Sequence, residues 1–156
     1  VAEAFGQAGP VDVIDASFSI VSTEPAALTV PQRVPHVDAF GADRIALVHY
    51  LAPEGGDGTS FYRHRATGFE TVSEDRRDLF FRHLDTEIRH AGPPEAAYIN
   101  GDTPLFTCIH AVEARFNRAL LYRSWNLHSG AIAADAALSA DPVEGRLTVT
   151  AFLRIG

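Results

Sequence analysis

Short apolar stretches separated by turn residues recur along this chain, and this pattern constrains its fold more than any other feature. Apolar and polar residues alternate over Val11–Val21, which predicts a strand with one wet face, whereas Arg44–Leu51 is apolar on both faces and should form a central strand. Further strands are expected over Thr59–His64, Leu105–Val112, Arg118–Tyr122, Leu127–Ala133 and Arg146–Ile155. A parallel sheet would need a helix between most of its strands, so the pattern predicts a mainly β fold, a double-stranded β-helix of the jelly-roll or cupin-like barrel type.

A single helix is expected to interrupt the strands and to pack on a sheet. It should begin after Ser73, a good N-cap followed by two acidic residues, and stop near Gly92, which precedes two prolines. The glycines of Glu54–Gly58 predict a tight turn before the next strand. The apolar positions of the helix form one stripe, which consists of Phe80, Leu84, Ile88 and Ala91.

The composition predicts one domain without nucleic-acid or membrane partners. The 156 residues are 46% hydrophobic, which suffices for a core, and we expect a single domain over 1–156. The sequence contains no methionine, so a natural N-terminal segment is expected to be missing. A formal net charge of −7 disfavours binding to a phosphate backbone, and no apolar stretch reaches the roughly 18 residues of a membrane span. We therefore expect a cytoplasmic protein, with the single cysteine, Cys108, in its core.

The segment His36-Val37-Asp38 is the clearest candidate for chemistry. Residues two apart in an extended segment face the same way, so the imidazole and the carboxylate can bind one ion. Because the chain has seven histidines, a His-x-Asp triplet arises readily by chance and proves little by itself. The alternative is a surface turn, with the later His128 unrelated to it.

The order of the surrounding residues gives the triplet its significance. After it come Tyr50-Leu51 at a strand end, Gly55-Gly56, Thr59-Ser60-Phe61, and later Trp125-Asn126-Leu127-His128 and Gly145-Arg146. In this order the sequence, over about Val34–Phe152, resembles the prolyl-hydroxylase-like branch of the iron(II)- and 2-oxoglutarate-dependent dioxygenases. It also resembles a bacterial family of unknown function within that superfamily, on the segments Phe61-Tyr62-Arg63-His64 and Leu127-His128-Ser129-Gly130.

The resemblance implies an enzyme that binds Fe(II) through His36, Asp38 and His128 and takes 2-oxoglutarate as co-substrate. It assigns Arg146 to the distal carboxylate of 2-oxoglutarate, with Tyr50 donating its phenol to the same carboxylate. The implied reaction is hydroxylation or another oxidation of a small molecule or a protein side chain. His128 and Arg146 lie eighteen positions apart, farther than in better-known members, and a loop insertion over Ala133–Asp141 would account for the difference.

Other polar residues carry weaker predictions. Arg63, Tyr62, Trp125 and Asn126 are candidates for contacts with the substrate, because they flank the metal-binding strands and combine flat apolar surface with polar ends. The basic run Arg63-His64-Arg65 could hold an anionic group, although a solvated strand end is the commoner explanation.

The same residues leave structural alternatives open. Arg146 could be an edge-strand cation and Tyr50 an ordinary core aromatic, while His49 and His110 are interpreted as core histidines. Two other functions also remain open, namely a non-catalytic β-barrel binding module and a cupin-like metal enzyme that does not use 2-oxoglutarate.

Overall fold

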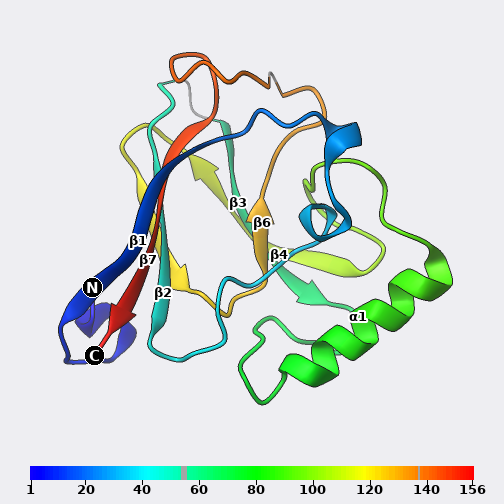
Figure 1. Cartoon of the computed structure of the whole chain (residues 1–156), viewed down its shortest axis with the longest axis horizontal. Helices are drawn as coiled ribbons and strands as arrows, with labels where there is room; N and C mark the ends of the chain where they lie inside the picture. The colour runs from blue at the N-terminus through cyan, green and yellow to red at the C-terminus, as the bar shows by residue number, and fades with distance from the viewer. Residues whose placement is uncertain (54–55, 137) are drawn as a thin grey trace.

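The computed structural model describes residues 1–53, 56–136 and 138–156, and most of its regular structure is β (Figure 1). A four-stranded antiparallel sheet has the order β1 (Val11–Ile20), β7 (Leu147–Ile155), β2 (Arg44–Tyr50) and β5 (Ala119–Arg123). A three-stranded antiparallel sheet has the order β4 (Phe106–Ala114), β3 (Gly56–His64) and β6 (His128–Gly130). The prediction of a mainly β fold is therefore confirmed at the level of two antiparallel sheets, and no closed barrel is found in the described part of the chain.

The predicted strands all form, and their ends agree within two residues except in two cases. The strand expected from Thr59 begins at Gly56, and the one expected over Leu127–Ala133 is confined to three residues of β6. β6 stops early because the amide of Ile132 turns to the carbonyl of Ile99, outside the sheet. The turn predicted over Glu54–Gly58 lies partly outside the described residues.

The two sheets face each other through side chains of β2, β3 and β5. The rings of Phe61 on β3 and Tyr122 on β5 meet edge to face, with centroids 5.2 Å apart. The Tyr50 hydroxyl on β2 donates a hydrogen bond of 2.7 Å to Thr59 Oγ1 on β3. The space between the sheets is therefore lined by aromatic and polar groups as well as by aliphatic ones.

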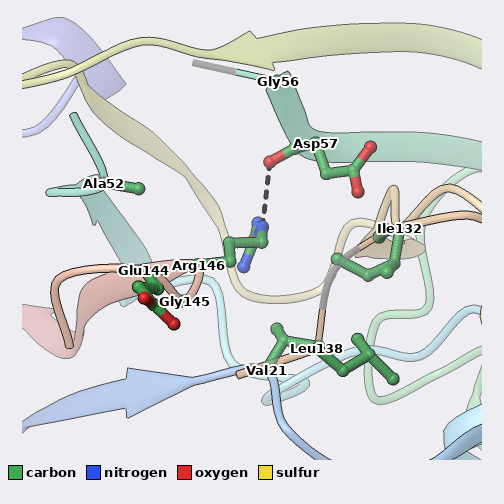
Figure 2. Close-up of a pocket in the computed structure, with 10 residues that line it drawn as sticks. Val21, Ala52, Gly56, Asp57, Ile132, Leu138, Glu144, Gly145 and Arg146 are labelled. Atoms are coloured by element: carbon green, nitrogen blue, oxygen red, sulfur yellow. Dashed lines mark hydrogen bonds between the residues drawn. The ribbon is translucent and has the colours of Figure 1, made fainter. Parts of the chain in front are cut away.

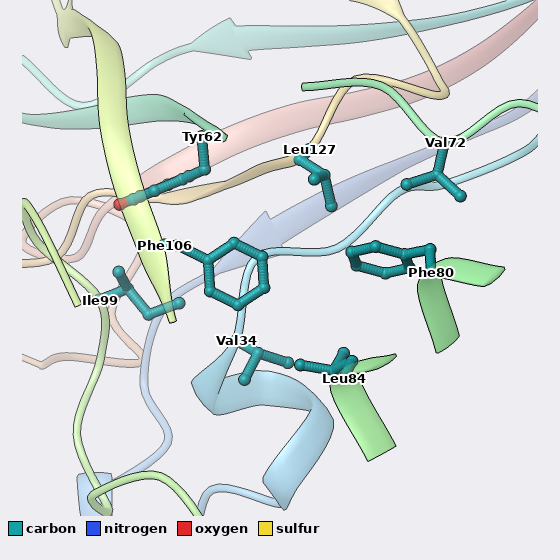
Figure 3. Close-up of a cluster of buried hydrophobic side chains, with 8 residues drawn as sticks. All are labelled: Val34, Tyr62, Val72, Phe80, Leu84, Ile99, Phe106 and Leu127. Carbon is teal, nitrogen blue, oxygen red and sulfur yellow. The ribbon is translucent and has the colours of Figure 1, made fainter. Parts of the chain in front are cut away.

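The larger apolar cluster lies on the other side of the three-stranded sheet (Figure 3). Tyr62 and Leu127 belong to it. Tyr62 follows Phe61 and Leu127 precedes His128, and these two neighbours face the other sheet, because successive side chains of an extended segment point to opposite sides. α1 (Arg77–Ala91) covers this side with Phe80 and Leu84. The full cluster comprises Val34, Tyr62, Val72, Phe80, Leu84, Ile99, Phe106 and Leu127.

The helix ends where the sequence predicts but begins later. Gly92, with φ of 84°, follows its last residue. At the start, the amide of Arg76 donates to the carbonyl of Ser73, so Ser73 begins a turn and is not the N-cap. Ala91 is exposed although the stripe predicted it on the packed face. Among the described residues, no helix has the length and apolar character to cross a membrane.

A second apolar cluster covers the outer side of the four-stranded sheet. It is formed by Ile45, Ala151, Leu153 and Ile155, with Ala2 and Phe5 of the N-terminal segment packed against it. The neighbouring strand β1 is largely exposed, and Phe18 has 74% of its surface in solvent. Cys108 is half-buried against the cluster under α1, close to its predicted place in the core.

His64 is a fully buried polar residue at the end of β3, where it contacts Glu87 of α1. Its Nε2 lies 2.8 Å from Glu87 Oε2 and its Nδ1 lies 2.9 Å from Thr67 Oγ1. Phe80 and Phe106 pack against its ring. Burial lowers the pKa of His64, and this effect outweighs the hydrogen bond to Glu87, which raises the pKa.

We predict that His64 makes the stability of the protein depend on pH. Since the pKa is lower in the folded chain, the unfolded chain takes up a proton first. The contribution of neutral His64 to the free energy of unfolding is therefore complete above the unfolded pKa of about 6.5. It is lost as the pH falls below that value. Urea unfolding between pH 5 and 7.5 should give a shallower pH dependence for His64→Gln than for the wild type. His83→Gln, on the exposed side of α1, should retain the wild-type slope, and equal slopes for all three proteins would contradict this role.

We also predict that Leu127 is a main contributor to the core. Its side chain is 0% exposed, so Leu127→Ala should lower the free energy of unfolding by about 2–5 kcal/mol through lost burial and the cavity left behind. Leu79→Ala on α1 is the control, because Leu79 is 43% exposed and its removal should change stability far less. Chemical denaturation measures both values, and similar losses would contradict the assignment of the core.

Candidate metal centre

Two backbone hydrogen bonds hold His36 beside His128, although the residues are 92 positions apart in the sequence. The amide of each donates to the carbonyl of the other, over 2.9 and 3.0 Å. In such an antiparallel pair both side chains lie on the same face, and the two ring centroids are 4.4 Å apart. The amide of Asp38 donates to the carbonyl of Ser124, so the segment that carries His36 and Asp38 runs alongside the one that leads to His128.

The three predicted ligands form one group. His36 Nε2 lies 3.7 Å from Asp38 Oδ1, and His128 Nε2 lies 3.5 Å from Asp38 Oδ2. Two atoms that each bind one ion at about 2.1 Å are at most about 4.2 Å apart, and both distances are within this limit. Ligand atoms of all three residues lie within 4.8 Å of one another. The prediction that they come together is confirmed, and the group can hold a metal ion.

The orientation of His128 suits a metal ligand. Its Nδ1 lies 2.9 Å from the carbonyl oxygen of Asn126, which can only accept, so Nδ1 carries the hydrogen. Nε2 therefore keeps its lone pair and directs it towards Asp38. A carbonyl that fixes the second nitrogen in this way is the usual support of a metal-binding imidazole.

Electrostatics also favour a cation at this place. Asp38 Oδ2 is buried and makes no hydrogen bond within the described residues. Burial raises the pKa of Asp38, and this effect outweighs the nearby His36, which lowers the pKa. Burial lowers the pKa of His128 to about 4. Partial removal from water, together with the neighbouring His128, lowers the pKa of His36, whose side chain is 52% exposed. Both imidazoles are thus neutral at neutral pH, and a metal ion would compensate the buried carboxylate.

A cavity of about 510 Å³ adjoins the group and reaches Arg146. His36 and Arg146 both line it, together with buried apolar residues such as Leu28 and Ile132. The rest of its wall includes Val21, Pro31, Gln32, Tyr98, Ser129 and Gly130. A smaller cavity of about 240 Å³ is also lined by Arg146 and shares Val21 and Ile132 with the larger one (Figure 2).

Arg146 precedes the first residue of β7 and points into the interior between the sheets. Its Nε donates to the carbonyl of Asp57 over 2.9 Å, the contact dashed in Figure 2, and its Nη2 donates to the carbonyl of Gly58 over 2.7 Å. Gly58 permits a close approach of β4, because a Cβ at this position would lie 1.8 Å from the carbonyl oxygen of Val112. Two neutral carbonyls therefore fix the guanidinium, and no carboxylate among the described residues forms an ion pair with it.

Tyr50 lies beside Arg146 with its hydroxyl already engaged. The guanidinium carbon of Arg146 is 5.6 Å from the centre of the Tyr50 ring, and the hydroxyl donates to Thr59. Tyr50 is 1% exposed. Its arrangement fits a residue that supports Arg146, whereas the resemblance assigns it a direct contact with the co-substrate.

The four weaker substrate candidates lie away from the triad's cavity or serve structural roles. Tyr62 is fully buried in the cluster under α1, and Arg63 forms an ion pair with Glu70 at the surface. The carbonyl of Trp125 accepts from Val72, and Asn126 pairs with Thr71 while its carbonyl orients His128. The structure therefore gives none of the four a place on the wall of the cavity that holds His36 and Arg146.

The other histidines and the basic run have partners of their own. His49 is half-buried with Nε2 2.9 Å from Asn117 Oδ1, and His110 is exposed on β4, so the prediction of a core position is wrong for His110. In the run Arg63-His64-Arg65 each residue faces a carboxylate, from Glu70, Glu87 and Asp102 respectively. Sequence reasoning missed the role of the carbonyls of Asn126, Asp57 and Gly58, because any residue can supply a carbonyl.

We predict that the chain binds one divalent ion at the triad. With Co²⁺ as the probe, a free concentration 100 times the Kd should raise the free energy of unfolding by about 2.7 kcal/mol. His36→Ala and Asp38→Ala should abolish this increase, since each removes a ligand atom. His110→Ala on exposed β4 is the matched control and should respond as the wild type does. An increase that persists in both triad variants would place the ion elsewhere.

Comparison with known proteins places the chain in a family but gives it no function. No curated protein and no solved structure matches the chain. One family matches residues 1–153, which is nearly the whole chain, and it is described as a family of unknown function, DUF6445. This match covers β1 to β6 and most of β7, and it includes the triad and Arg146. The chain therefore belongs to the family of unknown function DUF6445.

Proposed function

We propose that this chain is an Fe(II)- and 2-oxoglutarate-dependent oxygenase acting on a small molecule or a protein side chain. The observation that carries the proposal is that His36 and Arg146 line one cavity. Two histidines and one carboxylate are the ligand set typical of non-haem iron(II) oxygenases. 2-Oxoglutarate has a keto acid end that can bind a metal and a distal carboxylate that suits a guanidinium.

The charges of the site support this co-substrate. Asp38 has a buried oxygen without a hydrogen-bond partner, and Arg146 is a partly buried cation held by carbonyls. Buried charges are normally paired, so one end of the site favours a metal ion and the other an anion. A dicarboxylate that also binds the metal satisfies both requirements at once.

The topology supports a double-stranded β-helix, which is the finer fold that we propose. The chain passes back and forth between the two sheets. β1 belongs to the four-stranded sheet, the segment at His36 bridges to β6 at the edge of the three-stranded sheet, and β2 belongs to the four-stranded sheet again. β3 and β4 then lie in the three-stranded sheet, β5 in the four-stranded sheet, β6 in the three-stranded sheet and β7 in the four-stranded sheet. With the segment at His36 as an eighth strand, this is the arrangement of two facing four-stranded sheets found in jelly rolls.

In the proposed enzyme, Fe(II) with 2-oxoglutarate and dioxygen supplies the oxidising chemistry. His36, Asp38 and His128 hold the ion, and the carbonyl of Asn126 keeps His128 in the required tautomer. Arg146 orients the co-substrate through its distal carboxylate. The buried side chains of Leu28 and Ile132 keep water from that part of the cavity.

A cupin-like metal enzyme without 2-oxoglutarate has less support. It would be favoured by a further histidine beside the triad or by an Arg146 that points away from it. His49 is bonded to Asn117 and His110 is exposed, whereas Arg146 lines the cavity next to His36. A non-catalytic binding module would be indicated by metal binding without any binding of 2-oxoglutarate.

We predict an absorption band when Fe(II) and 2-oxoglutarate are added together to the protein without oxygen. Arg146→Gln should weaken the binding of 2-oxoglutarate about ten-fold or more, because a hydrogen-bonded charge pair is lost, and should leave metal binding intact. Arg154→Gln on β7 is the control, since Arg154 is an exposed partner of Asp43. The proposal is refuted if the wild type gives no such band, or if Arg146→Gln binds 2-oxoglutarate as tightly as the wild type does.

A further inference from the structure

The cavity that His36 and Arg146 line, called the larger cavity below, has room for a second ligand beside 2-oxoglutarate. Its volume of about 510 Å³ is within the range of sites that enclose drug-sized molecules, whereas 2-oxoglutarate is a small dicarboxylate. The metal ligand His36 lies on its wall, and so does Ser129, which directly follows the metal ligand His128. A compound in the remaining space would lie next to the metal centre, so the wall of this cavity indicates which kind of substrate the site accepts.

The wall of the larger cavity carries little charge. Among the described residues, Arg146 is its one permanently charged side chain, and no Asp or Glu lines it. Leu28 and Ile132 are each 3% exposed and make part of the wall apolar. The smaller cavity differs, because Asp57 and Glu144 line it together with Arg146 (Figure 2). A charged group of a substrate would therefore find no counter-ion in the larger cavity once Arg146 binds the co-substrate.

The hydroxyl groups on this wall already donate to the protein. The Tyr98 hydroxyl donates to the carbonyl of Thr23 over 2.9 Å, and the Ser129 hydroxyl donates to the carbonyl of Gly130 over 3.1 Å. A hydroxyl has one hydrogen, so neither group has a second one to donate to a ligand. Tyr98 and Ser129 therefore shape the cavity, and a different residue must provide a hydrogen-bond donor.

Gln32 has this donor in its side-chain amide. It belongs to the 3-10 helix Val30–Arg33, and its Oε1 accepts hydrogen bonds from the backbone amide and the hydroxyl of Thr29, both over 2.8 Å. A backbone amide can only donate, so the atom that faces it must be the oxygen of Gln32. Nε2 makes no hydrogen bond within the described residues, and Gln32 is an exposed residue on the wall of the larger cavity. Its N–H groups can therefore donate to a ligand.

We propose that the substrate is an uncharged, largely apolar small molecule with a carbonyl or similar acceptor, and that Gln32 binds this acceptor. This inference rests on the proposed function and adds the class of substrate to it. The apolar body of the substrate lies against Leu28 and Ile132, the acceptor faces Nε2 of Gln32, and the part that is oxidised lies towards His36. Substrates with a carboxylate or an ammonium group are excluded, because Arg146 is occupied and the wall has no carboxylate.

Three probes of similar shape test the class of substrate. Naphthamide, naphthoate and naphthylmethylammonium share a flat apolar body and are neutral, negative and positive, respectively. Each is titrated into the protein loaded with Co²⁺ and 2-oxoglutarate, and the naphthyl fluorescence is followed. Naphthamide should bind at least about ten-fold more tightly than either charged probe, because a charged group would lose water without gaining a counter-ion. Equal affinities, a preference for a charged probe, or no binding of naphthamide overturns the inference.

Gln32→Glu tests whether the probes bind at this residue. The variant keeps an oxygen that accepts from the amide of Thr29, but it replaces the N–H donor by a negatively charged acceptor. Naphthamide should bind about three-fold to ten-fold more weakly, whereas naphthylmethylammonium should bind more tightly than it does to the wild type. Gln7→Glu is the matched control, because it adds the same charge at a residue that does not line the larger cavity, and it should leave all three affinities unchanged.

The absorption band of the Fe(II)-loaded protein with 2-oxoglutarate separates this inference from the proposed function. If the wild type gives the band but shows no preference for naphthamide, or if Gln32→Glu binds all three probes as the wild type does, the inference is overturned and the proposed function stands. A wild type that binds Co²⁺ but never 2-oxoglutarate overturns both.

Discussion

The reciprocal backbone hydrogen bonds between His36 and His128 are the contact on which the rest of the site depends. They join the segment after the 3-10 helix Val30–Arg33 to the edge of the three-stranded sheet, and so place two imidazoles on one face. Asp38 follows two residues later and is held by the carbonyl of Ser124. Without this bridge, His36 and Asp38 would belong to an extended connection between the sheets, and His128 would keep only its aromatic neighbours Tyr122 and Phe61.

The site departs from ordinary protein interiors in its unpaired polar groups. A folded chain normally pairs its buried charges and hydroxyls, yet Asp38 has a buried oxygen without a partner, and Arg146 is held only by carbonyls. Arg146 lines the same cavity as His36, the neighbour of Asp38 in the triad. Each unpaired buried group lowers the stability of the folded chain when no ligand is bound, and such groups are concentrated at binding sites. Together they indicate a metal cation and an anion as neighbours.

The sequence predicted what depends on local patterns and missed what depends on partners from elsewhere. Strand positions follow from residue alternation, and the end of α1 follows from Gly92, whose positive φ favours glycine. The triad was predicted through a resemblance in residue order, not through spacing alone. In contrast, no local signal distinguishes the buried His64 from the exposed His110, or predicts that the hydroxyl of Tyr50 is bonded to Thr59. Those differences arise from which strand pairs with which, and Thr59, Glu87 and Asn126 supply the deciding partners.

The location of the two apolar clusters explains how the interior can remain polar. α1 covers the outer side of the three-stranded sheet, and Phe5 covers that of the four-stranded sheet, so much of the apolar burial occurs outside the space between the sheets. That space can then hold Arg146, Tyr122 and the triad without removing the main driving force for folding. Substitutions in the outer clusters should therefore act mainly on stability, whereas those on the inner faces should act mainly on ligand binding. Leu127 and His128 lie next to each other in the chain but belong to these two different sides.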